Sequence, residues 1–173
     1  MFPTIAGAVI LVLGCTALGF YYASHDGFRV MDLHEFKKAL MILSSEIEHM
    51  RTPLPIACEN IAKRTAAPVN ILFTRFSESL AENSGETAYQ LWSQAIDGQK
   101  KQSFLATEDW DVLDGFGKTL GYLDKQMQQS AIGLVVEYIN EKTISIQTQA
   151  EKNRRMYRSL GVIGGLLVAV VLW

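Results

Sequence analysis

The middle of the chain carries apolar residues at steps of three and four, the spacing that places side chains on one face of a helix. The first such segment runs from Arg29 to Met50. Its apolar stripe consists of Val30, Leu33, Phe36, Leu40, Leu43, Ile47 and Met50, and the charged residues expected off it are Asp32, Glu35, Lys38, Glu46 and Glu48. This pattern predicts an amphipathic helix with one face in a core.

Four further helical segments follow, each with a starting signal and a short apolar face. Thr52 can cap a helix that has Pro53 at its first position, Pro68 begins the next helix, and Thr87 and Thr107 are the expected caps of the two after it. The residues expected to point inward are Leu54, Ala57, Cys58 and Ile61; Leu72, Phe73, Phe76 and Leu80; Leu91, Trp92, Ala95 and Ile96; and Leu113, Phe116 and Leu120.

Three glycines interrupt the fifth segment at positions 115, 117 and 121. Glycine weakens a helix by about 1 kcal/mol relative to alanine, and it is tolerated where two backbones approach closely or where a helix ends. Gly121 suits a helix end. Asp124 can then cap a long final helix.

The final helix is predicted to continue without a break to Trp173. A helix from Asp124 to Trp173 would be a rod of roughly 75 Å. A face near Met127, Leu134, Val135, Tyr138 and Ile139 is expected to pack on the other helices, and the polar segment 143–153 is expected to project as a stalk.

No strand alternation persists anywhere, and no hairpin turn has flanking strands. The fold class expected from these patterns is all-α. We predict a bundle of about six helices over residues 25–158, with residues 1–24 and 159–173 as flanking transmembrane helices and the last bundle helix continuous with the second of them.

The N-terminal segment, Phe2 to Ala23, has no charged residue. As a helix it would span roughly 33 Å, which is enough to cross a bilayer core of about 30 Å. A cleaved signal peptide is the alternative, but it needs a positively charged start, and no Lys or Arg precedes Arg29.

The C-terminal segment, Leu160 to Trp173, is shorter, at roughly 21 Å as a helix. Nine of its fourteen residues are Leu, Ile or Val, which favours insertion by about 3–5 kcal/mol. Tyr157 and Met156 can add to its apolar length if Arg158 snorkels. The segment is therefore expected to span with help from a partner helix, and a helix buried in its own domain is the alternative.

The basic residues near the two segments predict one orientation. Arg29, Lys37 and Lys38 follow the first segment, and Lys152, Arg154, Arg155 and Arg158 precede the second. Basic flanks stay in the cytoplasm, so we expect the helical domain in the cytosol and both termini outside. Cys15 and Cys58 would then lie in different environments and could not form a disulfide.

Motifs for catalysis or cofactor binding are missing. The sequence has no phosphate-binding loop, nucleophile elbow, HExxH or CxxC motif, and its three histidines lack metal-ligand spacing. The net charge of −2 gives no basic excess for nucleic acid. We therefore expect no catalytic residue, metal, cofactor or small-molecule substrate.

Carboxylates and small residues are the remaining candidates. Glu46 and Glu48, and the group Asp109, Asp111, Asp114 and Asp124, could converge as an acid–base pair or on a cation, although a solvated acidic surface is the simpler interpretation. Gly161 and Gly165 form a small-residue motif that could pack against Gly7 and Gly14 of the first span.

Four stretches occur in an order typical of one family. They are ALMILSSEIEHMRTPLPIACENIA, LWSQAI, FGKTLGYLDKQMQQ and SLGVIGGLLVAVVLW. With them the chain resembles the stage III sporulation protein AB family over essentially its whole length. The positions that carry the resemblance are Leu43, Glu46, Ile47, Thr52, Pro53, Leu54, Ala57, Trp92, Phe116, Gly117, Leu120, Gly121, Asp124 and Gln129.

The resemblance implies a location and a role. Such proteins belong to the channel complex between mother cell and forespore, and they sit in the mother-cell membrane that engulfs the forespore. Their cytosolic domain is similar to that of the inner-membrane platform proteins of type II secretion and type IV pilus systems. By this analogy the domain docks the ATPase stage III sporulation protein AA and other channel-complex proteins.

The leading hypothesis is accordingly a non-catalytic membrane scaffold that docks or couples an ATPase. Glu46 and Asp124, on exposed acidic helix edges, are the candidate partner-binding residues, with a packing salt bridge and a helix cap as their simpler interpretations. Two alternatives stay open: a small membrane-bound hydrolase that uses paired carboxylates, and a purely structural oligomer held together by the glycines of its spans.

Overall fold

The structure is a computed structural model that describes residues 25–50, 52–82, 85–121 and 125–172, with the side chains of 49–50 and 154–172 outside the description. The chain divides into two units. One compact unit comprises residues 27–140, and the other comprises the two ends, residues 1–26 and 141–173. The residues discussed below as candidate sites all belong to the first unit.

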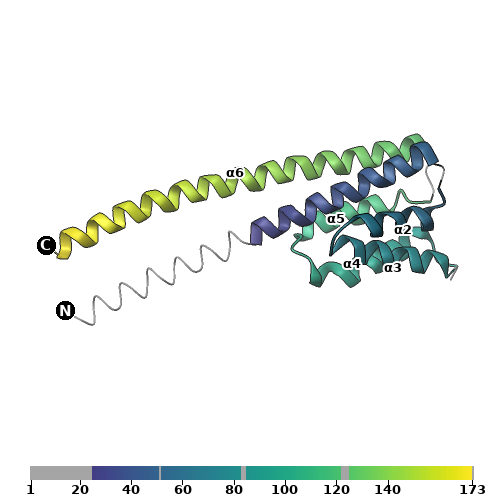
Figure 1. The fold of residues 1–173 in the computed structure, drawn as a ribbon, viewed down its shortest axis with the longest axis horizontal. Coiled ribbons are helices and arrows are strands. Elements are labelled where there is room, and N and C mark those ends of the chain that lie inside the picture. Colours follow the sequence, from purple (N-terminus) through teal and green to yellow (C-terminus); the bar gives the residue numbers. More distant parts are fainter. Residues whose placement is uncertain (1–24, 51, 83–84, 122–124, 173) are drawn as a thin grey trace. The chain divides into compact units, whose positions relative to one another are not determined.

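The described part of the chain contains six α-helices and no strand, as the sequence predicts. A helix over residues 25–45 comes first and ends in a π-helical turn, η1. The following elements, shown in Figure 1, are α2 (Leu54–Arg64), α3 (Val69–Ala81), α4 (Ala88–Gln99), the 3-10 turn η2 (Lys100–Gln102), α5 (Thr107–Gly117) and α6 (Lys125–Leu172); η1 is Glu46–Met50.

The 25–45 helix buries most of its predicted stripe, including Leu33, Phe36, Leu40 and Leu43. Two of its charged residues differ from the expectation that they lie off this stripe. Asp32 and the first residue of η1, Glu46, are both buried. Asp32 precedes Phe36 by four residues and therefore lies on the same helix face.

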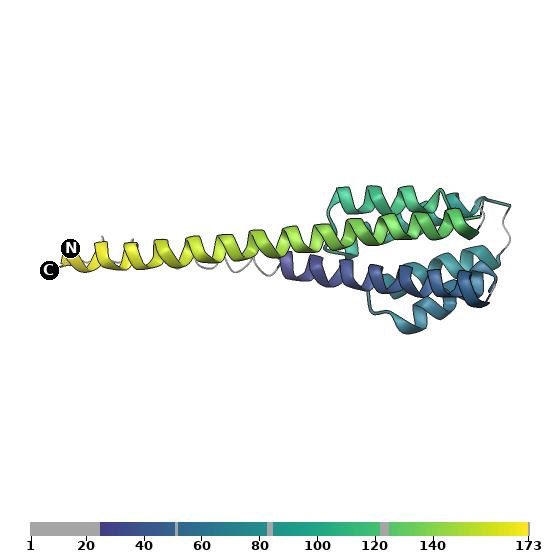
Figure 2. The same cartoon turned by 90° about the horizontal axis from the view of Figure 1, so that it is seen from above.

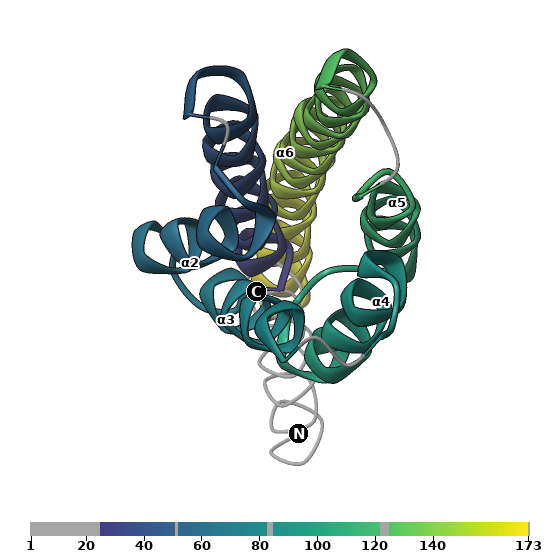
Figure 3. The ribbon, with the colours of Figure 1, turned by 90° about the vertical axis from the view of Figure 1, so that its right-hand side faces the viewer.

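Consecutive helices from α2 to α5 pack against one another, and seen end-on in Figure 3 they follow in chain order. At their centre the ring of Trp92 meets Phe73, Phe76 and Phe116 edge-on, with centroids 5.1–6.0 Å apart. The indole Nε1 donates to the backbone oxygen of Leu113 at 2.9 Å.

Gly117 lies at a close approach, but the neighbour is the side chain of Trp92 and not the second backbone that the sequence suggested. A Cβ atom placed on this residue would lie 2.0 Å from Cδ1 of Trp92, so no side chain fits there. Gly121 has a φ of +91°, in the left-handed region that favours glycine, and it ends the turns that follow α5. Gly115 faces open space instead.

One of the expected threonine caps is confirmed and two are wrong. Thr87 caps α4, since its Oγ1 accepts from the amide of Gln90. Thr52 does not cap α2; Pro53 holds the cap position, and the Thr52 hydroxyl donates to Glu46 instead. Thr107 is the first helical residue of α5, after Ala106. Pro68 precedes α3 as predicted, after a cis peptide bond from Ala67.

The first part of α6 lies beside the 27–45 part of the first helix in Figures 1 and 2. The two run antiparallel, because Lys37 bonds to Asn140 near one end and Lys125 bonds to the backbone oxygen of Glu48 near the other. Within this part of α6 the buried residues are Ile132, Val135 and Ile139.

Two residues predicted for the packed face of α6 are exposed. Met127 and Leu134 point away from the core, because at 3.6 residues per turn they lie on nearly the opposite face from Ile132. The expected polar stalk also differs in part from the prediction. Thr143 and Ile146 have buried side chains, while the other side chains of residues 143–153 are exposed or half-buried.

None of the helices in the described part of the chain is long and apolar enough to cross a membrane. Residues 1–24, with Gly7 and Gly14, lie outside the described residues, and so do the side chains of the predicted C-terminal span, with Gly161 and Gly165. Asp124 also lies outside them. The two spans and the helix cap therefore stay predictions, while the helical backbone of α6 does run without a break to Leu172, as expected.

Candidate functional site

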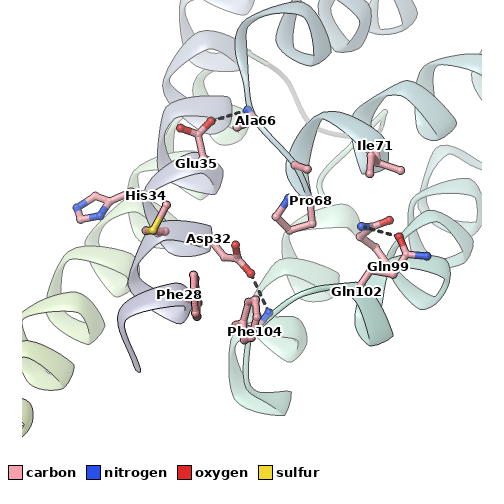
Figure 4. A pocket seen from close by; sticks show the side chains of 12 residues that line it. Phe28, Asp32, His34, Glu35, Ala66, Pro68, Ile71, Gln99, Gln102 and Phe104 are labelled. Carbon is pink, nitrogen blue, oxygen red and sulfur yellow. Dashed lines mark hydrogen bonds between the residues drawn. The ribbon is translucent and has the colours of Figure 1, made fainter. Parts of the chain in front are cut away.

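A solvent-open hollow of about 400 Å³ is the first candidate site in the 27–140 unit. Figure 4 shows that its walls come from three segments: the start of the 25–45 helix, the chain from Ala66 to Ile71 that leads into α3, and residues 99–104 around η2. These segments are far apart in the sequence. We name this site the Asp32 hollow after the charged residue in its wall.

Asp32 is 7% exposed, and its Oδ2 accepts a hydrogen bond from the backbone amide of Phe104 at 2.8 Å. Burial raises the pKa of this carboxyl group above its ordinary value, and the bond from Phe104 opposes that rise. Within the described part of the chain, no lysine, arginine or histidine forms an ion pair with it. Asp32 is thus a buried carboxylate to which the described residues supply no counter-ion.

The rim of the hollow is apolar. The rings of Phe28 and Phe104 stack with centroids 4.7 Å apart, and both side chains remain partly exposed. Met31, one residue before Asp32, is 63% exposed. Large exposed apolar side chains gathered at one hollow are typical of a surface that contacts another molecule.

A second polar group in the wall lacks a partner. The side chain of Gln99 is fully buried, and its Oε1 makes no hydrogen bond in the described structure. Its Nε2 donates to Gln102 at the long distance of 3.5 Å. Burying an amide oxygen without a partner costs about 1–3 kcal/mol, so this group, like Asp32, has unused capacity to accept a hydrogen bond.

Glu35 also lines the Asp32 hollow, but its carboxylate is occupied. Its Oε2 accepts from the backbone amide of Ala66 at 2.8 Å and lies 3.5 Å from Nζ of Lys38. Asp32 and Glu35 are each bonded to a different backbone amide (Figure 4).

A second hollow of about 700 Å³ opens on the next turns of the same helix and has a basic lining. Lys37, Lys38 and Arg64 contribute their side chains to it, and Glu46 lies in its wall. His34 is common to the linings of both hollows.

The expectation that Glu46 belongs to an exposed acidic edge is wrong, because its side chain is only 6% exposed. Its two carboxylate oxygens accept from Thr52 at 2.7 Å and from Asn60 at 3.2 Å. The simpler interpretation, that Glu46 forms a packing salt bridge, is also wrong, because both of its donors are neutral. Glu46 ties the end of the first helix to α2, and a role in partner binding stays a prediction.

Asp109, which the sequence suggested as part of a solvated acidic surface, is instead the centre of a buried cluster. It is 1% exposed and receives Nε and Nη2 of Arg29 at 2.8 and 3.0 Å. The hydroxyl of Tyr138 donates to it at 2.8 Å and the amide of Ala106 at 2.9 Å. Four donors from three helical regions therefore meet on one carboxylate, which we call the Asp109 cluster.

The charges in the Asp109 cluster stabilise each other. The hydrogen bonds that Arg29 donates to Asp109 raise the pKa of Arg29, and Glu108 adds a second, exposed partner at 2.8 Å. Burial, together with the bond to Asp109, raises the pKa of Tyr138. The cluster joins the first helix, α5 and α6.

Two of the other carboxylates that the sequence suggested, those of Asp111 and Asp114, do not belong to the Asp109 cluster. Asp111 is exposed, and Asp114 accepts from the hydroxyl of Tyr89 at 2.9 Å. In the described residues no group of three or more His, Cys, Asp or Glu side chains could hold a metal ion. Burial raises the pKa of the Cys58 thiol to about 12, which agrees with its expected place in the core.

Sequence reasoning missed the Asp32 hollow. The four-residue spacing between Asp32 and Phe36 was the signal that could have placed Asp32 on the buried face of its helix. Sequence reasoning gave no signal for Gln99 or for the pairing of Phe28 with Phe104. Phe28 and Phe104 are more than 70 positions apart, and periodicity within one helix does not report such a pairing.

The comparisons with known proteins agree on one family. The family profile described as Stage III sporulation protein AB matches residues 4–173. The stage III sporulation protein AB of Bacillus subtilis (strain 168) is 34% identical over 166 residues, covering 96% of each chain. A solved structure of a stage III sporulation protein AB superposes with a TM-score of 0.67 at 31% identity, covering 72% of this chain and 97% of that one. The chain therefore belongs to the stage III sporulation protein AB family of sporulation proteins.

Proposed function

We propose that this chain is a non-catalytic, membrane-anchored platform that docks a cytosolic ATPase during sporulation. Membership of the sporulation family supports the process. The uncharged N-terminal stretch and the apolar C-terminal stretch support anchoring in the mother-cell membrane, with the 27–140 unit in the cytosol.

The observation that carries the docking role is the apolar rim of the Asp32 hollow. Phe28, Met31 and Phe104 expose apolar surface around a recess, which is the arrangement of an anchor site in a protein–protein interface. The proposed partner is an ATPase of the stage III sporulation protein AA kind, taken from the platform analogy.

Recruitment of the ATPase to oriented membrane vesicles tests anchoring, orientation and docking together. Vesicles from cells that produce the full chain are prepared inside-out and right-side-out, then floated through a density gradient with purified ATPase. The chain is expected in the floating fraction after an alkaline wash, and the ATPase is expected to float only with inside-out vesicles.

Substitutions at exposed apolar residues locate the docking surface. Met31→Glu places a charge on the rim and is expected to reduce recruitment at least about tenfold, the cost of losing one interface anchor. Met41→Glu, in the basic hollow, and Leu134→Glu, on α6, are matched controls that should leave recruitment unchanged. Equal recruitment by both vesicle orientations, or by wild-type and Met31→Glu chains, contradicts the proposal.

A further inference from the structure

We propose that the Asp32 hollow is the receptor for an arginine side chain of the docked partner, whose guanidinium completes an ion pair with Asp32. The inference rests on the proposed function for the partner's identity. The chemistry of the occupant follows from the hollow itself, by four steps.

The charge of Asp32 requires a positive partner when a second protein covers the hollow. The carboxylate is already nearly excluded from water and has one hydrogen bond, from Phe104. A purely apolar partner would remove the remaining water and leave the charge uncompensated, which is strongly unfavourable. A cationic occupant instead gains a charge-assisted hydrogen bond in a site shielded from solvent.

A metal ion does not suit this hollow. Hard cations such as Ca²⁺ and Mg²⁺ need several oxygen ligands, whereas the second carboxylate in the lining, that of Glu35, already bonds to Ala66 and pairs with Lys38. The described residues offer no group of three metal-binding side chains. One available carboxylate oxygen fits a hydrogen-bond donor better than a coordination shell.

The aromatic rim favours arginine over lysine. A planar guanidinium can lie against the ring of Phe28 or Phe104 and still direct its N–H groups to a carboxylate, whereas an ammonium group is compact and strongly hydrated.

The volume agrees with this occupant. About 400 Å³ open to solvent holds one long side chain and part of the backbone that carries it, but it is small for a folded element. The hollow therefore fits a single protruding residue of the partner, with the apolar rim contacting the surface around it.

A small arginine probe tests the hollow without the ATPase. The full chain, in detergent and with ¹³C-methyl methionine, is titrated with Nα-acetyl-arginine amide and, separately, with Nα-acetyl-lysine amide. Saturable shifts are expected at Met31 on the rim, with weaker effects from the lysine probe and none at Met41 or Met127. Asp32→Asn should remove the Met31 shift. An unshifted Met31 in the wild-type chain overturns the inference, as does a shift that survives Asp32→Asn.

A second experiment separates this inference from the proposed function. In the vesicle assay, Asp32→Asn should weaken ATPase binding at least about tenfold, as truncation of a buried charge pair does, while Asp111→Asn, at an exposed carboxylate, should not. A double-mutant cycle should then couple Asp32 to one arginine of the ATPase. If the Asp32→Asn chain binds the ATPase as well as the wild-type chain does, the proposal that the hollow receives an arginine is wrong, while the proposed docking of the ATPase still stands. Absence of binding by the wild-type chain overturns docking, and the probe titration still decides the receptor.

Self-association is the other outcome to measure. The exposed Arg64 of a second copy could enter the hollow, in which case Asp32→Asn and Arg64→Gln would both abolish a dimer seen by sedimentation. That result would identify a second copy of this chain, and not the ATPase, as the source of the arginine, and it would overturn the inference.

Discussion

Two buried aspartates in the same helical unit differ in how their carboxylates are paired. Asp109 receives a two-point contact from Arg29 and two further donors, whereas Asp32 receives one amide and no cation among the described residues. Asp32 lies near the start of the first helix, and Asp109 contacts the same region through Arg29. Removing one partner of a buried ion pair is strongly destabilising, and a buried charge that has no counter-charge is itself unfavourable.

The largest expected effect comes from removing the charge of Asp109. Asp109→Asn leaves Arg29, whose side chain is only 15% exposed, with Glu108 as its remaining carboxylate. Breaking a buried ion pair costs about 3–5 kcal/mol, and Glu108 should keep the loss near the lower value, about 3 kcal/mol. Urea unfolding of the full chain in detergent, followed by helical circular dichroism, measures it. A loss below about 1 kcal/mol would show that the cluster is not structural.

An intermediate effect is expected at the edge of the Asp109 cluster. Tyr138→Phe removes one hydrogen bond to a charged acceptor and keeps the ring, so the free energy of unfolding should fall by about 1.5 kcal/mol. Tyr89→Phe is the matched control, because its bond to Asp114 is at a half-buried position outside the cluster. Equal losses for the two variants would contradict a special role for Asp109.

The smallest change in the free energy of unfolding is expected at Asp32, and it should be a gain and not a loss. Its pKa is raised by burial, so the folded state holds the proton more tightly than the unfolded state does. The stability from this group is complete below the unfolded pKa and is lost as the pH rises through the folded pKa. Asp32→Asn keeps an acceptor for Phe104 and should make the chain equally or slightly more stable at pH 7, by less than about 1 kcal/mol.

The pH dependence checks that sign. The advantage of Asp32→Asn over wild type should shrink as the pH falls into the acid range, where Asp32 becomes protonated. His34 and Glu35, from the same helix, are the other titratable groups that line the hollow, and the segments 66–71 and 99–104 contribute none. A variant less stable than wild type at pH 7 would mean that Asp32 already has its counter-charge, and the contrast with Asp109 would fail.

The sequence predicted the helices and much of the core because helical periodicity is a local property. The face of Leu91, Trp92, Ala95 and Ile96 is buried as expected, whereas the neighbour of Gly117 is the Trp92 side chain and not a second backbone. A local signal cannot tell which polar residue on a helix will meet a partner from another element. The same charge pattern is compatible with a solvated surface and with a buried network.

The two aspartates illustrate that limit. Asp109 meets Arg29 across 80 positions and Asp32 meets Phe104 across 72. These pairings depend on how the helices are arranged around one another, and only the folded structure provides that arrangement. Glu46 was expected on an exposed acidic edge, but it is buried and accepts from the neutral donors Thr52 and Asn60, which the sequence pattern did not predict.

The contact between Gly117 and Trp92 restricts how this domain can change during evolution. Because the indole occupies the space of the missing side chain, the two positions form one volume that either residue can fill but not both. Relatives with alanine at position 117 should therefore carry a smaller ring or an aliphatic residue at position 92. Substitutions at the two sites should appear together in the lineage and seldom one at a time.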